Sequence, residues 1–192
     1  MMNALDYIDS PMDSISSNDP YLIVDVIELI DDDQVKILLI DHLLNNLLSI
    51  DNTPYLLGYT LYLKSTFMDN KNKILLLEQA KRPFKNAIML DSENTTFAKA
   101  YLAHVYYDLE EFTNALHLIE QIPENYFAKL PSRQNWRDLK IQELKICCLI
   151  NLKKFINFEL ILYKFLLKIS KSNQYNIPLP TELSNTIKKI SS

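Results

Sequence analysis

The residues of this chain that could bind a metal ion or act as nucleophiles include three histidines and two cysteines. His42, His104 and His117 are scattered, and none stands in the His-Glu-x-x-His arrangement that binds catalytic zinc. Cys147 and Cys148 are neighbours in an apolar run, where a free cysteine packs as a small hydrophobic side chain and is badly placed to form a disulfide. We therefore expect neither a metal site nor a thiol nucleophile.

Other patterns that carry chemistry also have a structural interpretation. The run Asp31-Asp32-Asp33 lacks the spaced oxygen ligands of a calcium loop and is typical of a helix start. We find no serine nucleophile motif, glycine-rich phosphate loop or paired acids in a recognisable catalytic frame. The sequence predicts a protein that is not an enzyme and needs no cofactor.

The composition favours a single helical domain. The chain has 192 residues, of which 48% are hydrophobic, enough to form a substantial core. Gly58 is the only glycine, which argues against tight hairpins and most β-rich folds. The polar, acidic N-terminus resembles no targeting signal, and no apolar run has membrane-spanning length, so we expect a cytoplasmic protein in a reducing compartment.

Charge is distributed unevenly along the chain. Residues 1–33 contain nine Asp or Glu and no Lys or Arg, whereas residues 133–192 contain eleven Lys or Arg and four Asp or Glu. The favoured interpretation is solvated helix faces, because the lysines are interspersed with apolar residues. The alternative is a peripheral membrane, trafficking or nucleic-acid-associated factor that uses basic residues of the C-terminal third, namely Lys153, Lys154, Lys164, Lys168 and Lys171.

Apolar residues at helical spacing predict an all-α fold of antiparallel helix pairs. Residues 1–18 are expected to form a flexible acidic tail, followed by one domain over residues 19–192. Asp19 is expected to cap the first helix and Asp31 to open a capping box for the second. The predicted helices cover residues 20–30, 34–48, 55–67, 74–90, 95–109, 112–121, 136–152, 154–169 and 181–190.

The central helices carry an internal repeat. Ala80, Phe84, Ala87 and Leu90 have the spacing of a second repeat helix, and the next repeat follows directly. Its first helix contains Leu102-Ala103 and Tyr106-Tyr107, and its second contains Phe112 and Ala115. This pattern resembles the tetratricopeptide repeat, over about residues 54–170.

The resemblance implies a short right-handed α-solenoid and assigns each segment a place in it. An N-terminal helix pair (19–50) precedes two repeat-like pairs (54–122), a degenerate third pair (133–170) and a capping helix (181–191). Gly58 is expected to allow close approach of a neighbouring helix, across an insertion of about ten residues around 65–72. Pro83 predicts a bend in its helix, and Phe158 replaces the alanine expected in the third pair.

Placing the repeats in register predicts a groove that binds a segment of a protein partner. The expected lining is aromatic in the first two pairs and charged in the third: Tyr55, Tyr59, Tyr62, Phe97, His104, Tyr107, Lys140 and Glu143. The alternative is that the aromatic residues cover other helices or the N-terminal pair. Family members that hold a chaperone's C-terminal carboxylate have lysines and asparagines at groove positions where this chain has Tyr55, Tyr59 and Tyr101.

These expectations lead to a functional hypothesis without a named partner. The chain is predicted to be a protein-interaction scaffold, or an adaptor subunit of a larger intracellular assembly. A weak contact with an anionic membrane surface is a further expectation, and binding to nucleic acid is not expected. The partner's identity, the pathway and the oligomeric state do not follow from the sequence.

Overall fold

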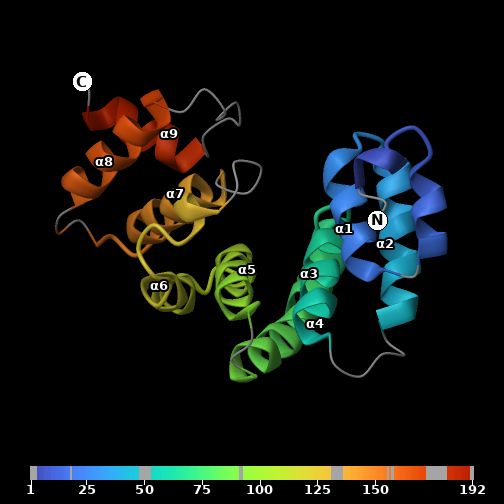
Figure 1. Ribbon diagram of the computed structural model, residues 1–192. Helices are drawn as coiled ribbons and strands as arrows, with labels where there is room; N and C mark the ends of the chain where they lie inside the picture. Colours follow the sequence, from blue (N-terminus) through green and yellow to red (C-terminus); the bar gives the residue numbers. More distant parts are fainter. Residues whose placement is uncertain are drawn as a thin grey trace. The chain divides into compact units, whose positions relative to one another are not determined.

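The computed structural model is all-helical in the residues that it describes, which confirms the all-α part of the predicted fold class (Figure 1). It describes residues 4–17, 19–47, 53–90, 93–130, 136–154, 156, 158–171 and 181–190. Three short 3-10 helices are η1 (Ala4–Tyr7), η2 (Pro11–Ser17) and η3 (Phe127–Lys129). The α-helices are α1 (Pro20–Leu29), α2 (Asp33–Leu47), α3 (Pro54–Ser65), α4 (Asn70–Met89), α5 (Thr95–Asp108), α6 (Phe112–Glu120), α7 (Trp136–Asn151), α8 (Phe158–Lys171) and α9 (Thr181–Ile190).

The chain divides into two compact units, whereas the sequence analysis predicted one domain from residue 19 onward. The N-terminal unit is Met1–Val105 and the C-terminal unit is Tyr106–Ser192. The boundary falls inside α5, where no proline, glycine or polar linker marks it in the sequence. Each unit has its own buried residues, and they are described separately below.

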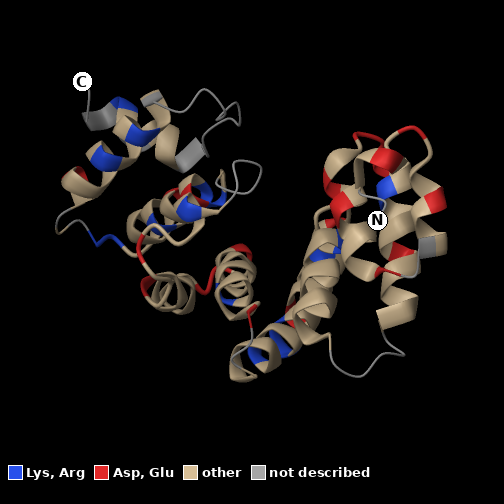
Figure 2. Cartoon of the chain, viewed as in Figure 1, with Lys and Arg blue, Asp and Glu red and all other residues tan. Residues whose placement is uncertain are grey.

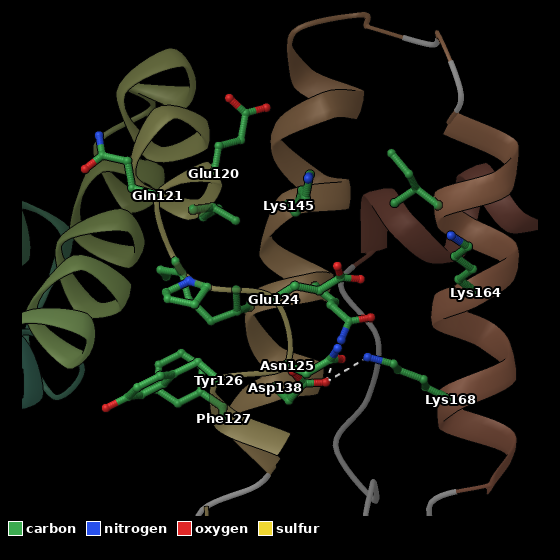
Figure 3. A pocket seen from close by; sticks show the side chains of 16 residues that line it. Glu120, Gln121, Glu124, Asn125, Tyr126, Phe127, Asp138, Lys145, Lys164 and Lys168 are labelled. Carbon is green, nitrogen blue, oxygen red and sulfur yellow. Dashed lines mark hydrogen bonds and ion pairs between the residues drawn. The ribbon is translucent and has the colours of Figure 1, made fainter. Parts of the chain in front are cut away.

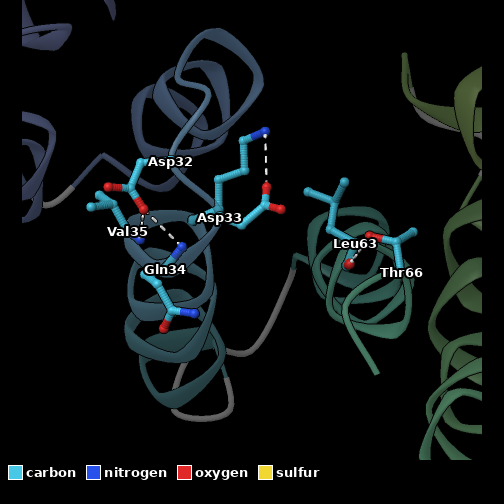
Figure 4. Close-up of polar contacts among 7 residues, drawn as sticks. Asp32, Asp33, Gln34, Val35, Leu63 and Thr66 are labelled. Atoms are coloured by element: carbon cyan, nitrogen blue, oxygen red, sulfur yellow. Dashed lines mark hydrogen bonds and ion pairs between the residues drawn. The ribbon is translucent and has the colours of Figure 1, made fainter. Parts of the chain in front are cut away.

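Aspartates start the first two helices. The Asp19 side chain accepts hydrogen bonds from the backbone N–H groups of Tyr21 and Leu22, as its position before Pro20 predicted. For α2 the cap is Asp32 instead of the predicted Asp31: its carboxylate accepts from the N–H groups of Gln34 and Val35 (Figure 4). In a run of three aspartates, helical spacing alone could not tell which residue begins the helix.

The first residues fold back onto the first two helices instead of standing apart as the predicted tail. Both η1 and η2 pack on α1, and η2 also packs on α2. Tyr7 and Ser14 are buried, and the Ser14 hydroxyl donates a 2.7 Å hydrogen bond to the Pro11 carbonyl. The helical period of 3.6 used to find helices does not match these short 3-10 turns, so the sequence analysis missed them.

The long helix α4 begins four residues earlier than predicted. Asp69 caps it by accepting from the Asn72 N–H at 2.9 Å, so the polar stretch 70–73 is helical and the predicted insertion is shorter. The helix continues without a break through Pro83, which is buried. The bend predicted at Pro83 remains a prediction.

Close packing of α3 on α4 explains the single glycine. Gly58 is buried on α3, and a Cβ atom built on it would lie 2.9 Å from Cγ and Cδ1 of Phe84 on α4. Heavy atoms do not approach this closely, so any side chain at position 58 would displace the fully buried Phe84 ring. The structure confirms that Gly58 serves close helix approach, as the sequence predicted.

The C-terminal unit is built around α7. Helices α6, α8 and α9 and the 3-10 helix η3 all pack on α7. The fully buried side chains of this unit include Phe127, Ile146, Phe165 and Leu183. Helix α9 covers residues 181–190 as predicted and buries Leu183; Ile190, which helical spacing is expected to place on the same face, lies outside the described side chains. Helix α8 begins at Phe158 instead of Lys154, and Phe155, which is expected to fit the second-helix pattern of the third pair, lies outside the described residues.

Three turns hold residues in the left-handed region of the backbone. Glu110 between α5 and α6 has φ 61°, Asn125 after α6 has φ 57°, and Lys153 after α7 has φ 54°. Glycine is the usual residue there because a Cβ atom disfavours positive φ. At these turns the chain has residues other than glycine, and its glycine, Gly58, lies at a helix packing contact.

Candidate functional site

The structure brings five of the predicted groove residues together in the N-terminal unit. Tyr55 and Tyr59 of α3 stack at 6.0 Å between ring centroids, and Tyr55 lies 6.2 Å from Phe97 of α5. Tyr62 lies 6.1 Å from His104. These contacts join α3 and α5 along one aromatic cluster, as the predicted register required.

Two further aromatic rings complete this cluster. Tyr101 of α5 lies 4.4 Å from Tyr59 and 5.7 Å from Tyr62, and its ring is nearly parallel to that of Phe84 at 6.4 Å. Phe84 is fully buried and Tyr101 is buried. The cluster is therefore largely a helix-helix packing contact between α3, α4 and α5.

Tyr59 makes a buried contact with the N-terminal helix pair. Its side chain is 5% exposed, and its hydroxyl donates a 2.6 Å hydrogen bond to the Glu28 carboxylate on α1. Burial raises the pKa of Tyr59 well above 10, and the nearby Tyr101 and Glu28 raise it further. For Tyr59 the alternative interpretation fits, because the side chain covers another helix. Tyr55, Tyr62, Phe97 and His104 are half-buried.

The other three predicted groove residues belong to the C-terminal unit. Tyr107 meets Phe112 edge to face at 5.4 Å. On α7, Lys140 Nζ donates to Glu143 Oε1 at 2.9 Å, and Glu143 is 6% exposed. Burial raises the pKa of Glu143, while Lys140 opposes that rise. The second carboxylate oxygen of Glu143 is buried and has no hydrogen-bond partner in the structure.

The two cysteines are buried thiols on the same helix. Both are free, and burial raises the pKa of each to about 12, with the neighbouring Glu143 a second cause for Cys147. Because the thiolate is the nucleophilic form, such thiols are unreactive near neutral pH. Their environment matches the prediction that they pack as core residues.

A concave site lies in the C-terminal unit, between the end of α6 and the segment that follows it, helix α7 and helix α8 (Figure 3). Its volume is about 890 Å³. Asn125, which adopts the left-handed conformation, lies in the segment after α6 that lines the pocket. Apolar residues from all three elements line the pocket: Ile119, Ile122, Pro123, Phe127, Ile141 and Ile161.

Charged side chains also line the pocket, between these apolar residues. Asp138 is fixed by two hydrogen bonds, from Gln142 Nε2 at 2.6 Å and from Lys168 Nζ at 3.0 Å (Figure 3). Lys145 on α7 and Lys164 on α8 also line the pocket and form no ion pair within the described part of the chain. Glu120 and Glu124 add negative charge on the side of α6 and its following segment. The pocket thus offers apolar contact together with charges of both signs.

The sequence analysis did not identify this pocket. In the sequence, the long connection between Pro123 and Pro131 has the composition of a loop and shows no binding motif. The lining residues come from separate segments with no common motif, and the side on which α8 packs is needed to bring Lys145 and Lys164 to one site. Helical spacing alone does not supply that information.

Within the described residues, no group of three or more His, Cys, Asp or Glu side chains is arranged to hold a metal ion. The same residues contain no helix with the length and apolar character needed to cross a membrane. Comparison of the chain with models of protein families, with curated proteins and with solved structures finds no match.

Proposed function

We propose that this chain is a non-catalytic scaffold that binds a segment of a partner protein, and that the C-terminal pocket is its binding site. The pocket is the observation that carries the proposal. A volume of about 890 Å³ suits several side chains of a peptide, and its mixture of apolar walls and a few charged groups is typical of recognition sites.

The pocket's geometry suggests how a peptide is held. Apolar partner side chains contact Ile122, Ile141 and Ile161, which supply most of the affinity through burial. Lys145 and Lys164 orient the peptide by attracting its acidic groups. Asp138 is held rigidly by Gln142 and Lys168, so it shapes the pocket floor more than it attracts ligand.

The state of the reactive groups supports binding over catalysis. The cysteine thiols stay protonated near neutral pH, the buried Tyr59 hydroxyl is hydrogen-bonded to Glu28, and the buried Glu143 is paired with Lys140. A general acid or base must reach its substrate, and burial denies these groups that access. The free, buried cysteines also fit the proposed cytoplasmic location.

The arrangement as a tetratricopeptide-like solenoid belongs to the same proposal. Its support is that Ala80, Ala103 and Ala115, the small residues expected at helix crossings, are all fully buried. Stacked helix pairs of this kind serve as rigid platforms for partner proteins. The aromatic cluster is then a structural element of the platform, with the edges of Tyr55 and Tyr62 left half-buried.

The test uses variants of the pocket in a capture experiment. Tagged wild type, Ile122→Arg and Lys145→Glu are incubated with lysate of the source organism, and stoichiometric partners are identified by mass spectrometry. Lys129→Glu is the matched control, because Lys129 is exposed in the same unit but does not line the pocket. Circular dichroism establishes that each variant folds.

We expect a partner recovered by wild type and Lys129→Glu and lost from both pocket variants. A fragment of that partner should then bind the purified chain with at least tenfold weaker affinity for Ile122→Arg, since an arginine fills the space left for an apolar side chain. Retention of all partners by folded pocket variants would place the binding surface elsewhere.

A further inference from the structure

Helix α8 is apolar on two opposite sides. One side buries Phe158, Leu162 and Phe165 in the C-terminal unit. On the other side, Leu160, Tyr163 and Leu167 are 54%, 63% and 41% exposed, so they remain in contact with water. Their spacing of three and four residues places them in one row along the helix, which we call the α8 stripe.

Basic residues lie close to the α8 stripe in the sequence. Lys153 and Lys154 are exposed in the turn before α8, close to Ile156, which is 88% exposed. Lys164 is exposed one residue after Tyr163. Figure 2 shows Lys and Arg recurring along α7 and α8, in contrast to the acidic residues that recur in η1, η2, α1 and α2. Glu159 is the one acidic residue within α8.

We propose that the α8 stripe and its lysines form a docking face for an anionic membrane surface. A helix that exposes Leu and Tyr beside Lys is suited to the interface of a bilayer: the apolar side chains enter the headgroup region, and the ammonium groups meet lipid phosphates. The 14 residues of α8 span roughly 21 Å at 1.5 Å per residue, so the helix lies along the surface.

The shape and charge of the face favour lipid over a partner helix. The stripe is a ridge on the solvent side of one helix, and the concave pocket of the same unit is lined by different residues apart from Lys164 and Lys168. A ridge enters a fluid lipid layer readily, whereas a protein partner needs a complementary groove. Residues 133–192 contain eleven Lys or Arg and four Asp or Glu, and this basic excess favours contact with anionic headgroups.

This face shares Lys164 with the pocket proposed above, but its apolar row and Lys153 and Lys154 lie outside the pocket lining, so variants at those positions test the face alone. The test therefore changes residues that do not line the pocket: Leu160→Ser/Tyr163→Ser removes two of the three apolar residues of the stripe, and Lys153→Asn/Lys154→Glu removes the two lysines that precede α8. Asn is chosen at position 153 because it tolerates the left-handed backbone there. Circular dichroism establishes that both variants fold.

Matched controls carry the same kinds of change elsewhere. Ile74→Ser/Leu75→Ser removes two exposed apolar side chains from α4, and Lys129→Glu/Lys188→Asn removes the same charge from other exposed sites of the C-terminal unit. The full chain and its variants are sedimented with vesicles of phosphatidylcholine alone, and with vesicles that contain about 30% phosphatidylserine.

We expect the wild type and both controls to bind the anionic vesicles, with weaker binding to neutral vesicles and at high salt. The apolar variant should bind at least about tenfold more weakly, and the charge variant roughly fivefold more weakly per lysine. Absence of vesicle binding by the wild type would overturn the proposal. Equal losses of vesicle binding in the variants and in the controls would also overturn it. So would a result in which the wild type does not bind vesicles and Leu160→Ser/Tyr163→Ser loses a soluble protein partner.

Discussion

Substitution of Gly58 by alanine tests the packing of α3 on α4. Within a helix, Gly→Ala is normally stabilising by about 1 kcal/mol, because alanine has the higher helix propensity. Here the new methyl group would lie 2.9 Å from the fully buried Phe84 ring, which cannot move without disturbing Tyr55 and Tyr101 around it. Overpacking of a core costs about 1–3 kcal/mol. The clash should prevail, and we expect a net destabilisation of about 1 kcal/mol.

The assay is urea unfolding followed by circular dichroism, with hydrogen exchange measured for the amides of α3 and α4. In thermal unfolding followed by the same circular dichroism signal, a loss of about 1 kcal/mol in the free energy of unfolding should lower the melting temperature by roughly 4–8 °C for a unit of this size. The double variant Gly58→Ala/Phe84→Leu should lose less than the sum of its single changes, because the smaller side chain makes room for the methyl group. A Gly58→Ala protein more stable than wild type, or strict additivity, would refute the reasoning.

The remaining predictions concern buried polar groups. Tyr59→Phe removes the hydrogen bond to Glu28 and should cost about 1 kcal/mol in urea unfolding; the wild type should lose stability as the pH rises above about 10, where only unfolded Tyr59 ionises, and the variant should lose less. Lys140→Met leaves the Glu143 carboxylate buried without its ion pair, and should cost about 3 kcal/mol at neutral pH but less near pH 4.5, where protonation relieves the charge; an equal loss at both pH values would contradict this explanation. Cys147 should resist a thiol reagent at pH 8 in the folded protein and react within minutes in urea, because burial raises its pKa to about 12; rapid labelling of the native state would show an accessible thiolate.

Helix positions were predictable where local chemistry determines them. Asp19 before Pro20 gave the start of α1, Thr181 gave the start of α9, and the apolar spacing between Thr95 and Glu120 gave α5 and α6 within a residue or two. The predicted start of α4 was wrong because the polar residues Asp69-Asn-Lys-Asn resemble a break between two helices. These residues have modest helix propensity, and the capping hydrogen bond of Asp69 overcomes it.

The candidate site could be predicted only in part, because its residues depend on tertiary packing. Tyr55 and Phe97, and Tyr62 and His104, which were expected to line one groove, are neighbours in the structure, but whether they line a binding groove stays a prediction. The burial of Tyr59 agrees with the alternative that the aromatic residues cover other helices or the N-terminal pair, but repeat spacing could not name its partner Glu28, which lies on a helix outside the repeat pattern. The α8 stripe was missed for a related reason: a helix with apolar residues all around gives no indication of which side faces water.

The left-handed turns at Glu110, Asn125 and Lys153 give this protein room to evolve. A residue with a Cβ atom held at positive φ is about 1 kcal/mol less favourable than glycine there, so glycine at Glu110 or Lys153 would add stability without altering a core contact. Such a reserve can absorb later substitutions that change a binding surface at some cost in stability. A lineage that acquired glycine at these turns could therefore remodel the pocket or the α8 stripe with less risk of unfolding.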